Sequence, residues 1–285
     1  MMKNQVVLRS MGLGFLMLGM VASSCENNVP VPDYLVDEDA KTVARAVYSS
    51  RSVNFNNRPH GSTYSSSWAQ QDFGDGWGWN ASRTYISNQT LRITLVANSI
   101  GGGSGMTANV SLPPADSYEV SYQLRFHSAF DWSRGGKLGF GFLIGDGNTG
   151  CDRPTDGNGG SARLMWYQND SGRVYFRPYV YYRDQPSQCG DSFGKSYPSS
   201  GSLSKGTWYN VTIRVRSNTG SSANGSVQYI VNGTTVLNQS LRWTTNTSKR
   251  LINALSFHSF RGGSQSYWGS GSVGYIYYDN VSWKR

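Results

Sequence analysis

Several features that common protein classes depend on are scarce or missing in this sequence of 285 residues. Charged residues make up only 15% of it and form no polybasic tail, which argues against a loose nucleic-acid-binding arm. No glutamate occurs after Val120, so only aspartates could form the carboxylate pair of a glycoside hydrolase, and that class is disfavoured. The G-x-S-x-G, P-loop and Rossmann motifs are also absent from the sequence.

Metal ligands are equally sparse. The three histidines show no metal-ligand spacing; they are His60, His127 and His258. A loop rich in glycine and asparagine carries Asp146, Asp152 and Asp156, a pattern that suits either calcium or ordinary turn chemistry. We expect no metal and no organic cofactor, with calcium in that loop as the open alternative.

The sequence is rich in glycine, with 34 residues, and in aromatic side chains, at 13%. This composition is typical of many short strands joined by tight turns. The formal net charge of +9 favours an anionic partner such as nucleic acid, a membrane surface or an acidic polysaccharide. The plainer interpretation is that the charge only keeps the protein soluble.

The N-terminus has the pattern of a secretory signal. Lys3 and Arg9 precede an apolar run, residues 11–21, that is too short for a transmembrane helix. The run ends in V-A-S-S-C, which resembles a bacterial lipobox, with alanine where leucine is usual. We expect residues 1–24 to be a lipoprotein signal peptide and Cys25 to be lipidated. The protein would then be lipid-anchored in the bacterial cell envelope, in the outer membrane, facing the periplasm or the surface.

Loss of Lys3 and Arg9 with the signal peptide would leave a net charge of +7 on the mature chain, two less than +9. Residues 25–52 contain prolines and acids without a clear period and are interpreted as a tether. The composition changes at Val53, and residues 53–285 show neither a second linker nor a repeat. We therefore expect one domain, 53–285, in a monomeric protein.

The remaining two cysteines are Cys151 and Cys189. In the oxidising compartment that a secretory signal implies, a pair of cysteines is expected to form a disulfide. Two free thiols are the alternative.

Ten segments of the domain are predicted to be strands from alternating or β-branched patterns. Turn residues separate them, and Asn232-Gly233 is a strong hairpin signal. The predicted strands are residues 91–97, 118–126, 137–144, 162–167, 173–182, 208–216, 226–231, 234–237, 251–260 and 274–283. Such a series predicts an all-β fold, a two-sheet antiparallel sandwich or β-jelly roll, whereas a propeller is disfavoured because nothing repeats.

One predicted strand, residues 173–182, carries two arginines and three tyrosines on one face. Because strand side chains alternate, its other face is apolar and belongs to the core. The polar face consists of Arg173, Tyr175, Arg177, Tyr179 and Tyr181. It could be an ordinary exposed face, or a glycan groove in which rings stack on sugars and guanidinium groups bind carboxylates. A single-stranded nucleic acid would also suit it, but the secretory signal argues against nucleic acid.

Two further strands offer polar groups. Ser161 and Arg163 lie two residues apart and so share a face. Arg163 needs either an acidic partner or an open groove, since burying it unpaired is costly. Lys137 begins another strand, on the face that it would share with Gly139 and Gly141, and we expect these glycines to leave room for a ligand close to the backbone. The alternative is an ordinary surface lysine at the start of a strand.

These residues resemble polysaccharide lyase family 14 and the related glucuronan lyases. The segment F-D-W-S-R-G-G-K-L-G, followed by S-A-R-L-M-W, matches a fairly specific pair of motifs in that family. Later elements are similar too: F-R-G-G-S at residues 260–264 and Y-I-Y-Y-D-N at residues 275–280. The resemblance covers nearly all of residues 53–285 and implies a β-jelly roll that cleaves uronate polymers by β-elimination.

The resemblance also assigns roles. The family's lysine, serine and arginine fall on Lys137, Ser161 and Arg163, and its first tyrosine falls on Tyr175. Its second tyrosine falls on Arg177, a departure, and Tyr179 is the alternative two residues along. We predict catalysis by Lys137, Tyr175, Arg163 and Ser161, with Tyr175 the first choice for acid or base and Lys137 the second as base.

The predicted substrate-binding residues are Arg173, Arg177, Tyr179, Tyr181, His127 and Arg261. The sequence thus predicts a lyase that acts on an anionic polysaccharide such as alginate or glucuronan. A surface lipoprotein that binds acidic glycans without cleaving them is the alternative, because of Arg177.

Overall fold

The computed structural model describes residues 45–285. The predicted signal peptide, the lipidation site Cys25 and most of the predicted tether therefore lie outside the described residues. Within the described part, no helix is long and apolar enough to span a membrane.

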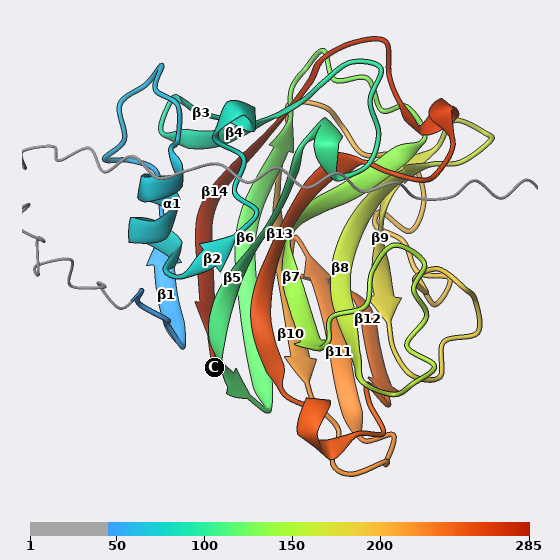
Figure 1. Ribbon diagram of the computed structural model, residues 1–285. Coiled ribbons are helices and arrows are strands. Elements are labelled where there is room, and N and C mark those ends of the chain that lie inside the picture. The colour runs from blue at the N-terminus through green and yellow to red at the C-terminus, as the bar shows by residue number, and fades with distance from the viewer. Residues whose placement is uncertain (1–44) are drawn as a thin grey trace, which may run out of the picture. The chain divides into compact units, whose positions relative to one another are not determined.

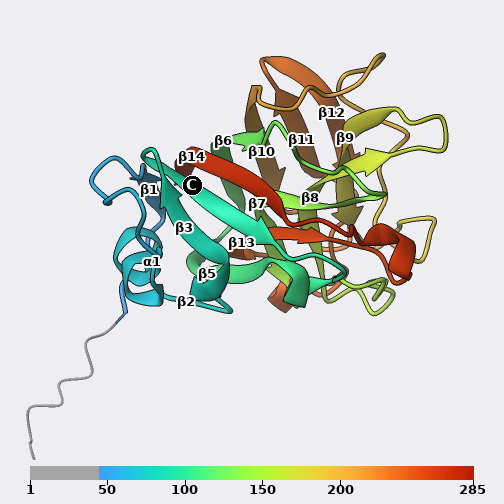
Figure 2. The same cartoon turned by 90° about the horizontal axis from the view of Figure 1, so that it is seen from above.

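Two antiparallel sheets make up the molecule, one lying on the other (Figures 1 and 2). One sheet has the strand order β12 (Thr234–Leu241), β11 (Gly225–Val231), β10 (Trp208–Arg216), β6 (Ser117–Phe126), β14 (Gly274–Lys284), β4 (Thr90–Leu95) and β3 (Thr84–Ser87), with β1 (Ser50–Val53) paired to β14. The other has the order β2 (Gly76–Trp77), β5 (Met106–Ala115), β13 (Ile252–Arg261), β7 (Gly135–Gly145), β8 (Gly159–Gln168) and β9 (Val174–Tyr181). The predicted all-β sandwich is confirmed.

The helical content is small. One α-helix, α1 (Ser66–Phe73), begins at Ser65, whose hydroxyl accepts a hydrogen bond from the backbone of Trp68, and ends at Gly74, whose φ is 97°. The remaining helical turns are η1 (Ala81–Arg83), η2 (Gly102–Ser104), η3 (Thr247–Lys249) and η4 (Ser266–Trp268).

All ten predicted strands are present, but β1, β2, β3, β5 and α1 were not predicted. Strand β5 contains Pro113 and Pro114, which normally exclude a central strand. They are tolerated because β2 pairs only with Val110 and Asn109, so the backbone of the two prolines faces no partner on that side.

The predicted boundary between tether and domain falls inside a strand. Ser50 to Val53 of β1 pair with Lys284 to Val281 of β14, and the indole of Trp283 donates a hydrogen bond to the carbonyl of Tyr48. The folded part therefore begins before Val53, because β14 needs a neighbour on its exposed side.

Aromatic rings fill the space between the sheets. Phe140 of β7 stacks on Phe257 of β13 with ring centroids 4.3 Å apart, and Phe73 of α1 stacks on Trp283 at 6.0 Å. Each such side chain is buried and contributes about 1.5–3 kcal/mol of transfer free energy. The high aromatic content seen in the sequence thus builds the core.

Strand β7 bulges next to Lys137. Gly139 has a φ of 60°, and its N–H donates to the hydroxyls of Tyr278 and Ser259. A Cβ there would lie 2.5 Å from the ring of Tyr122, and one on Gly141 would lie 2.1 Å from the carbonyl oxygen of Ala162. The prediction that both glycines make room for a ligand is therefore wrong: they make room for core side chains and for β8.

Candidate active site

A groove of about 780 Å³ crosses the outer face of the six-stranded sheet. Strands β5, β13, β7, β8 and β9 form its floor, and the loops around residues 101, 150, 189 and 263 form its walls. Its polar floor residues are Thr107, Asn109, Lys137, Arg163, Arg177, Tyr179 and His258. Among the described residues that line it, none is aspartate or glutamate. The groove is therefore strongly electropositive.

The strand register brings these side chains together. Lys137 of β7 lies opposite Met165 of β8, and Met165 lies opposite Arg177 of β9. Arg163 of β8 lies opposite Tyr179 of β9 in the same way. Side chains directly opposite each other in an antiparallel pair share a face, so all five point into the groove.

Lys137 is almost fully buried at the centre of the groove, with 8% of its surface exposed. Its Nζ lies 4.0 Å from the centre of the Tyr179 ring. Burial, together with the charges of Arg163 and Arg177, lowers the pKa of Lys137 well below its usual value. A lysine in this setting can be a neutral amine near neutral pH and so can accept a proton.

The two arginines have no carboxylate partner among residues 45–285. Arg163 is 4% exposed, and its Nε and one terminal nitrogen have no hydrogen-bond partner in the described part of the chain. The guanidinium of Arg177 stacks 4.1 Å above the ring of Tyr167 and points one nitrogen at the sulfur of Met165, 3.8 Å away. Because burying an unpaired cation is costly, the arrangement suits an anionic ligand.

His258 is a site residue that the sequence analysis missed. It lies on β13 in the groove, where burial, together with the charges of Arg163 and Lys137, lowers its pKa to about 3, so the ring is neutral. Its Nδ1 has no hydrogen-bond partner within residues 45–285. Side chains alternate along β13, so Phe257 is buried while His258 and Phe260 face the groove. This alternation in the sequence could have predicted that His258 belongs to the site.

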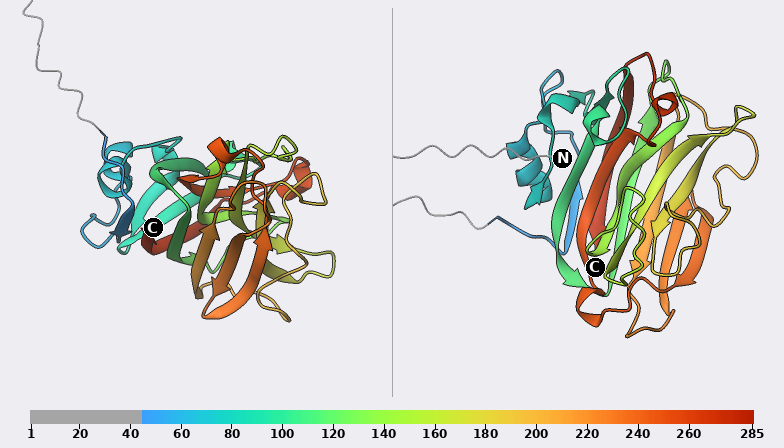
Figure 3. Two further views of the ribbon diagram at one scale, coloured as in Figure 1. Left: turned by 90° about the horizontal axis from the view of Figure 1, so that it is seen from below. Right: turned by 45° about the vertical axis from the view of Figure 1, so that its right-hand side comes forward.

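The walls of the groove are held in place by a disulfide. Cys151, in the loop 146–158, is bonded to Cys189, in the loop after β9, as predicted. The two loops lie side by side in Figures 1 and 3. Tyr181 accepts a hydrogen bond from the backbone N–H of Cys151 (2.8 Å), and Ser161 donates to the carbonyl of Asn148 (2.8 Å). Both side chains are fully buried and support the loop from below, so Ser161 and Tyr181 do not line the groove as their predicted catalytic and substrate-binding roles required.

Comparison with known proteins identifies the family. Residues 84–281 match the family model described as polysaccharide lyase 14. The chain belongs to the polysaccharide lyase 14 family.

Solved structures of lyases are similar to this chain. Alginate lyase Aly36B is 57% identical, with a TM-score of 0.83, over 84% of this chain and 98% of that chain. The marine PL-14 alginate lyase from Aplysia kurodai is 20% identical with a TM-score of 0.65, over 81% of this chain and 97% of its own, which shows a shared fold.

A curated relative is also similar over part of its length. Exolysin of Paramecium bursaria Chlorella virus 1 is 29% identical over 180 residues, which are 54% of this chain and 27% of that protein. The chain thus spans about a quarter of the curated relative that it matches.

In this member of polysaccharide lyase family 14, two of the predicted site residues lie outside the groove: Tyr175 of β9 and Arg173, which directly precedes β9. Tyr175 packs edge-on against Tyr167, with the guanidinium of Arg173 above its other side. Arg173 itself donates hydrogen bonds to Gly201 and to Ser196 and so holds the following loop. The alternation of the strand was predicted correctly, but the groove covers only its second half, so the predicted roles of Tyr175 and Arg173 in the site do not agree with the structure.

The other two misplaced predictions are His127 and Arg261. His127 packs against Tyr275 and Tyr277 of β14, in the other sheet. Arg261 is fully buried beside Phe130 and donates a hydrogen bond to the carbonyl of Asp131. Neither lines the groove, because His127 packs on β14 of the other sheet and Arg261 packs against Phe130.

The acids of the loop 146–158 are used locally. Asp146 pairs with Lys249 (2.6 Å), Asp152 accepts a hydrogen bond from Asn148, and Asp156 accepts two from Asn158. Within residues 45–285, no group of three or more His, Cys, Asp or Glu side chains is placed to hold a metal ion.

Proposed function

We propose that this polysaccharide lyase 14 member cleaves alginate by β-elimination, with Lys137 as the proton-abstracting base. The observation that carries the proposal is a buried lysine of lowered pKa between two arginines, in a groove whose described lining has no carboxylate. The choice of alginate follows from the 57% identity with alginate lyase Aly36B.

The spacing of three residues supports this assignment. Aly36B was crystallised with alginate tetrasaccharide after substitution of a lysine and a tyrosine, and with alginate trisaccharide after substitution of the same lysine and a methionine. In Aly36B the lysine precedes the methionine by 28 positions, and the methionine precedes the tyrosine by 14. Residues 137, 165 and 179 have these same spacings here, and they are Lys137, Met165 and Tyr179.

The first chemical task is to make the C5 proton of a uronate acidic. The carboxylate on C5 opposes this while it is charged, because removal of the proton places further negative charge on it. Arg163 and Arg177 can bind and neutralise that carboxylate, and the neutral ring of His258 can add a hydrogen bond. Arg163 and His258 are buried and Arg177 is half-buried, so they stabilise the enolate-like transition state more than fully exposed groups would.

Lys137 then takes the C5 proton and the electrons of the C5–H bond form the C4–C5 double bond, as the bond from C4 to the glycosidic oxygen breaks. The oxygen needs a proton. The ammonium that Lys137 has become is destabilised by burial and by two arginines, so it can return the proton to this oxygen. One group can serve both steps only if the proton and the leaving oxygen are on the same side of the ring, as in mannuronate.

The test is the ultraviolet absorbance of the unsaturated product, whose new double bond is conjugated with the carboxylate. On incubation with alginate, absorbance should rise, faster with polymannuronate than with polyguluronate. Lys137→Ala should lose at least about 1,000-fold in kcat and still be retarded in gels that contain alginate. Lys284→Ala, which removes an exposed lysine from the other sheet, is the matched control and should keep full activity.

Other results would contradict the proposal. A flat absorbance trace with retardation in the gel would mean that the protein binds glycans without cleaving them. The similarity to lyases argues against this alternative. A rise on glucuronan alone would keep the reaction and change the substrate.

We also propose that Cys25 is lipidated and anchors a monomeric enzyme in the bacterial cell envelope. The support is the sequence: Lys3 and Arg9, the apolar residues 11–21 and V-A-S-S-C. Labelled fatty acid should be incorporated into the full chain but not into a Cys25→Ala variant, which should leave the membrane fraction. Incorporation into both would contradict the assignment.

A further inference from the structure

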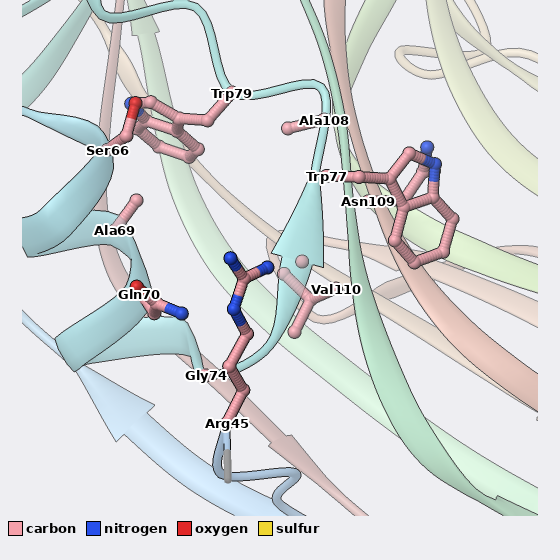
Figure 4. Close-up of a pocket in the computed structure, with 11 residues that line it drawn as sticks. Arg45, Ser66, Ala69, Gln70, Gly74, Trp77, Trp79, Ala108, Asn109 and Val110 are labelled. Carbon is pink, nitrogen blue, oxygen red and sulfur yellow. The ribbon is translucent and has the colours of Figure 1, made fainter. Parts of the chain in front are cut away.

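An exposed tryptophan lies at the edge of the six-stranded sheet. Trp77 of β2 has 53% of its surface exposed, although tryptophan side chains are highly buried on average. It pairs with Asn109 of β5, which lines the groove, so the two side chains are on the same face. Figure 4 shows the indole beside Asn109, away from the α1 residues Ala69 and Gln70.

The register places Trp77 in line with the catalytic residues. Asn109 lies opposite Ser256 of β13, and Ser256 lies opposite Gly141 of β7. Gly141 adjoins Arg163 of β8, since a Cβ on it would be 3.3 Å from the Cα of Arg163. Arg163 in turn lies opposite Tyr179 of β9. One row of side chains therefore crosses the whole sheet from Trp77 to Tyr179.

Asn109 is the polar group of this row that a ligand can reach. Ser256 and Gly141 in the middle of the row are buried, whereas Asn109 lines the groove. The Oδ1 of Asn109 has no hydrogen-bond partner among residues 45–285. An unpaired buried oxygen of this kind is rare and costly, and a hydroxyl group of a ligand could satisfy it.

A small recess extends the row. A cavity of about 130 Å³ lies between α1, β2 and β5, and both Trp77 and Asn109 contribute to its wall (Figure 4). The floor that begins at Lys137 thus continues past β5 to the sheet edge. Strands β7 and β2 are three strand spacings apart, roughly 14 Å, which is farther than one sugar ring reaches.

We propose that Trp77 and Asn109 form a distal subsite that binds a uronate unit of the polymer several units away from the bond being cleaved. The apolar face of the sugar stacks on the indole, and one of its hydroxyls donates to Asn109. This inference rests on the proposed function. Trp77 lies outside residues 84–281, the part of the chain that matches the family model, so the match does not include this residue. The subsite makes the polymer a better substrate than a short oligomer.

The test compares substrates of different length. In Trp77→Ala, kcat/KM on alginate polymer should fall about tenfold, mainly through KM, while kcat/KM on a trisaccharide should stay within about twofold. Trp77→Tyr keeps a stacking ring and should restore most of the affinity for the polymer. The matched control is Trp208→Ala, on β10 of the other sheet, which should match the wild type on both substrates.

Binding can be measured apart from turnover. In the Lys137→Ala background, Trp77→Ala should weaken retardation in alginate gels, whereas Trp208→Ala should not. Equal losses on polymer and trisaccharide would assign Trp77 a purely structural role and overturn the subsite, as would no loss on either. A wild-type protein that shows no turnover but whose retardation depends on Trp77 would overturn the proposed reaction and keep the subsite.

Discussion

At the scale of single residues, the site is built from cations without counterions. Lys137 and Arg163 are buried and Arg177 is half-buried, and their described surroundings offer aromatic rings instead of carboxylates. Rings attract a cation more weakly than a carboxylate does, and so they leave the charge available for a ligand. Binding of a uronate carboxylate would therefore relieve a cost that the free protein carries.

Two of the three tyrosines of β9 test how the proton moves. If Lys137 serves as both base and acid, Tyr179→Phe should keep kcat within about tenfold, because the ring against Lys137 remains, whereas loss of a proton donor would cost about 100- to 10,000-fold. Tyr175→Phe should be indistinguishable from wild type, since Tyr175 lies outside the groove. Steady-state rates on polymannuronate give both values. A loss in Tyr179→Phe of 100-fold or more would assign the donor role to Tyr179.

At the scale of elements, the groove depends on two loops as much as on strands. Loop residues Thr149 to Cys151 and Ser187 to Gly190 form one wall, and the only covalent link between them in residues 45–285 is the disulfide. Ser161 of β8 and Tyr181 of β9 both form hydrogen bonds with the loop 146–158. The wall is therefore positioned by β8 and β9, the strands that also carry Arg163 and Tyr179.

Removing this link should loosen the wall. The double substitution Cys151→Ser with Cys189→Ser opens a loop of 38 residues and should cost about 2–4 kcal/mol of stability, with a lower Tm and a higher KM for alginate. Thermal unfolding and steady-state kinetics measure the two effects. A reductant should shift the wild type towards the variant and leave the variant unchanged. An unaltered KM would show that the strands alone hold the wall.

At the scale of the whole molecule, the groove makes stability depend on pH. Folding holds His258 neutral, with its pKa lowered to about 3 from an ordinary value of 6.5. Between these two values the unfolded chain binds a proton that the folded chain does not. The free energy of unfolding must therefore fall as the pH is lowered through this window, and the contribution is fully present only above pH 6.5.

The contribution of His258 to the pH dependence of stability can be measured by comparing the wild type with a variant that lacks this histidine. From pH 7 to pH 5 the contribution of His258 should decrease by about 2 kcal/mol. Denaturant unfolding of wild type and His258→Gln at both pH values gives the comparison, in which titrating carboxylates common to both chains cancel. The variant should lose less stability than the wild type on acidification. Equal losses would mean that His258 titrates normally in the folded protein.

The sequence by itself determined the fold class, ten of the strands, the disulfide and the family. Alternation along a strand depends only on local geometry, so the shared face of Arg177, Tyr179 and Tyr181 could be predicted. Only the tertiary structure decided which part of that face the groove covers, and it excluded Tyr175. It also brought His258 and Asn109 to the groove and placed Trp77 beside Asn109, because strand order across a sheet joins residues far apart in the chain and no local pattern records it.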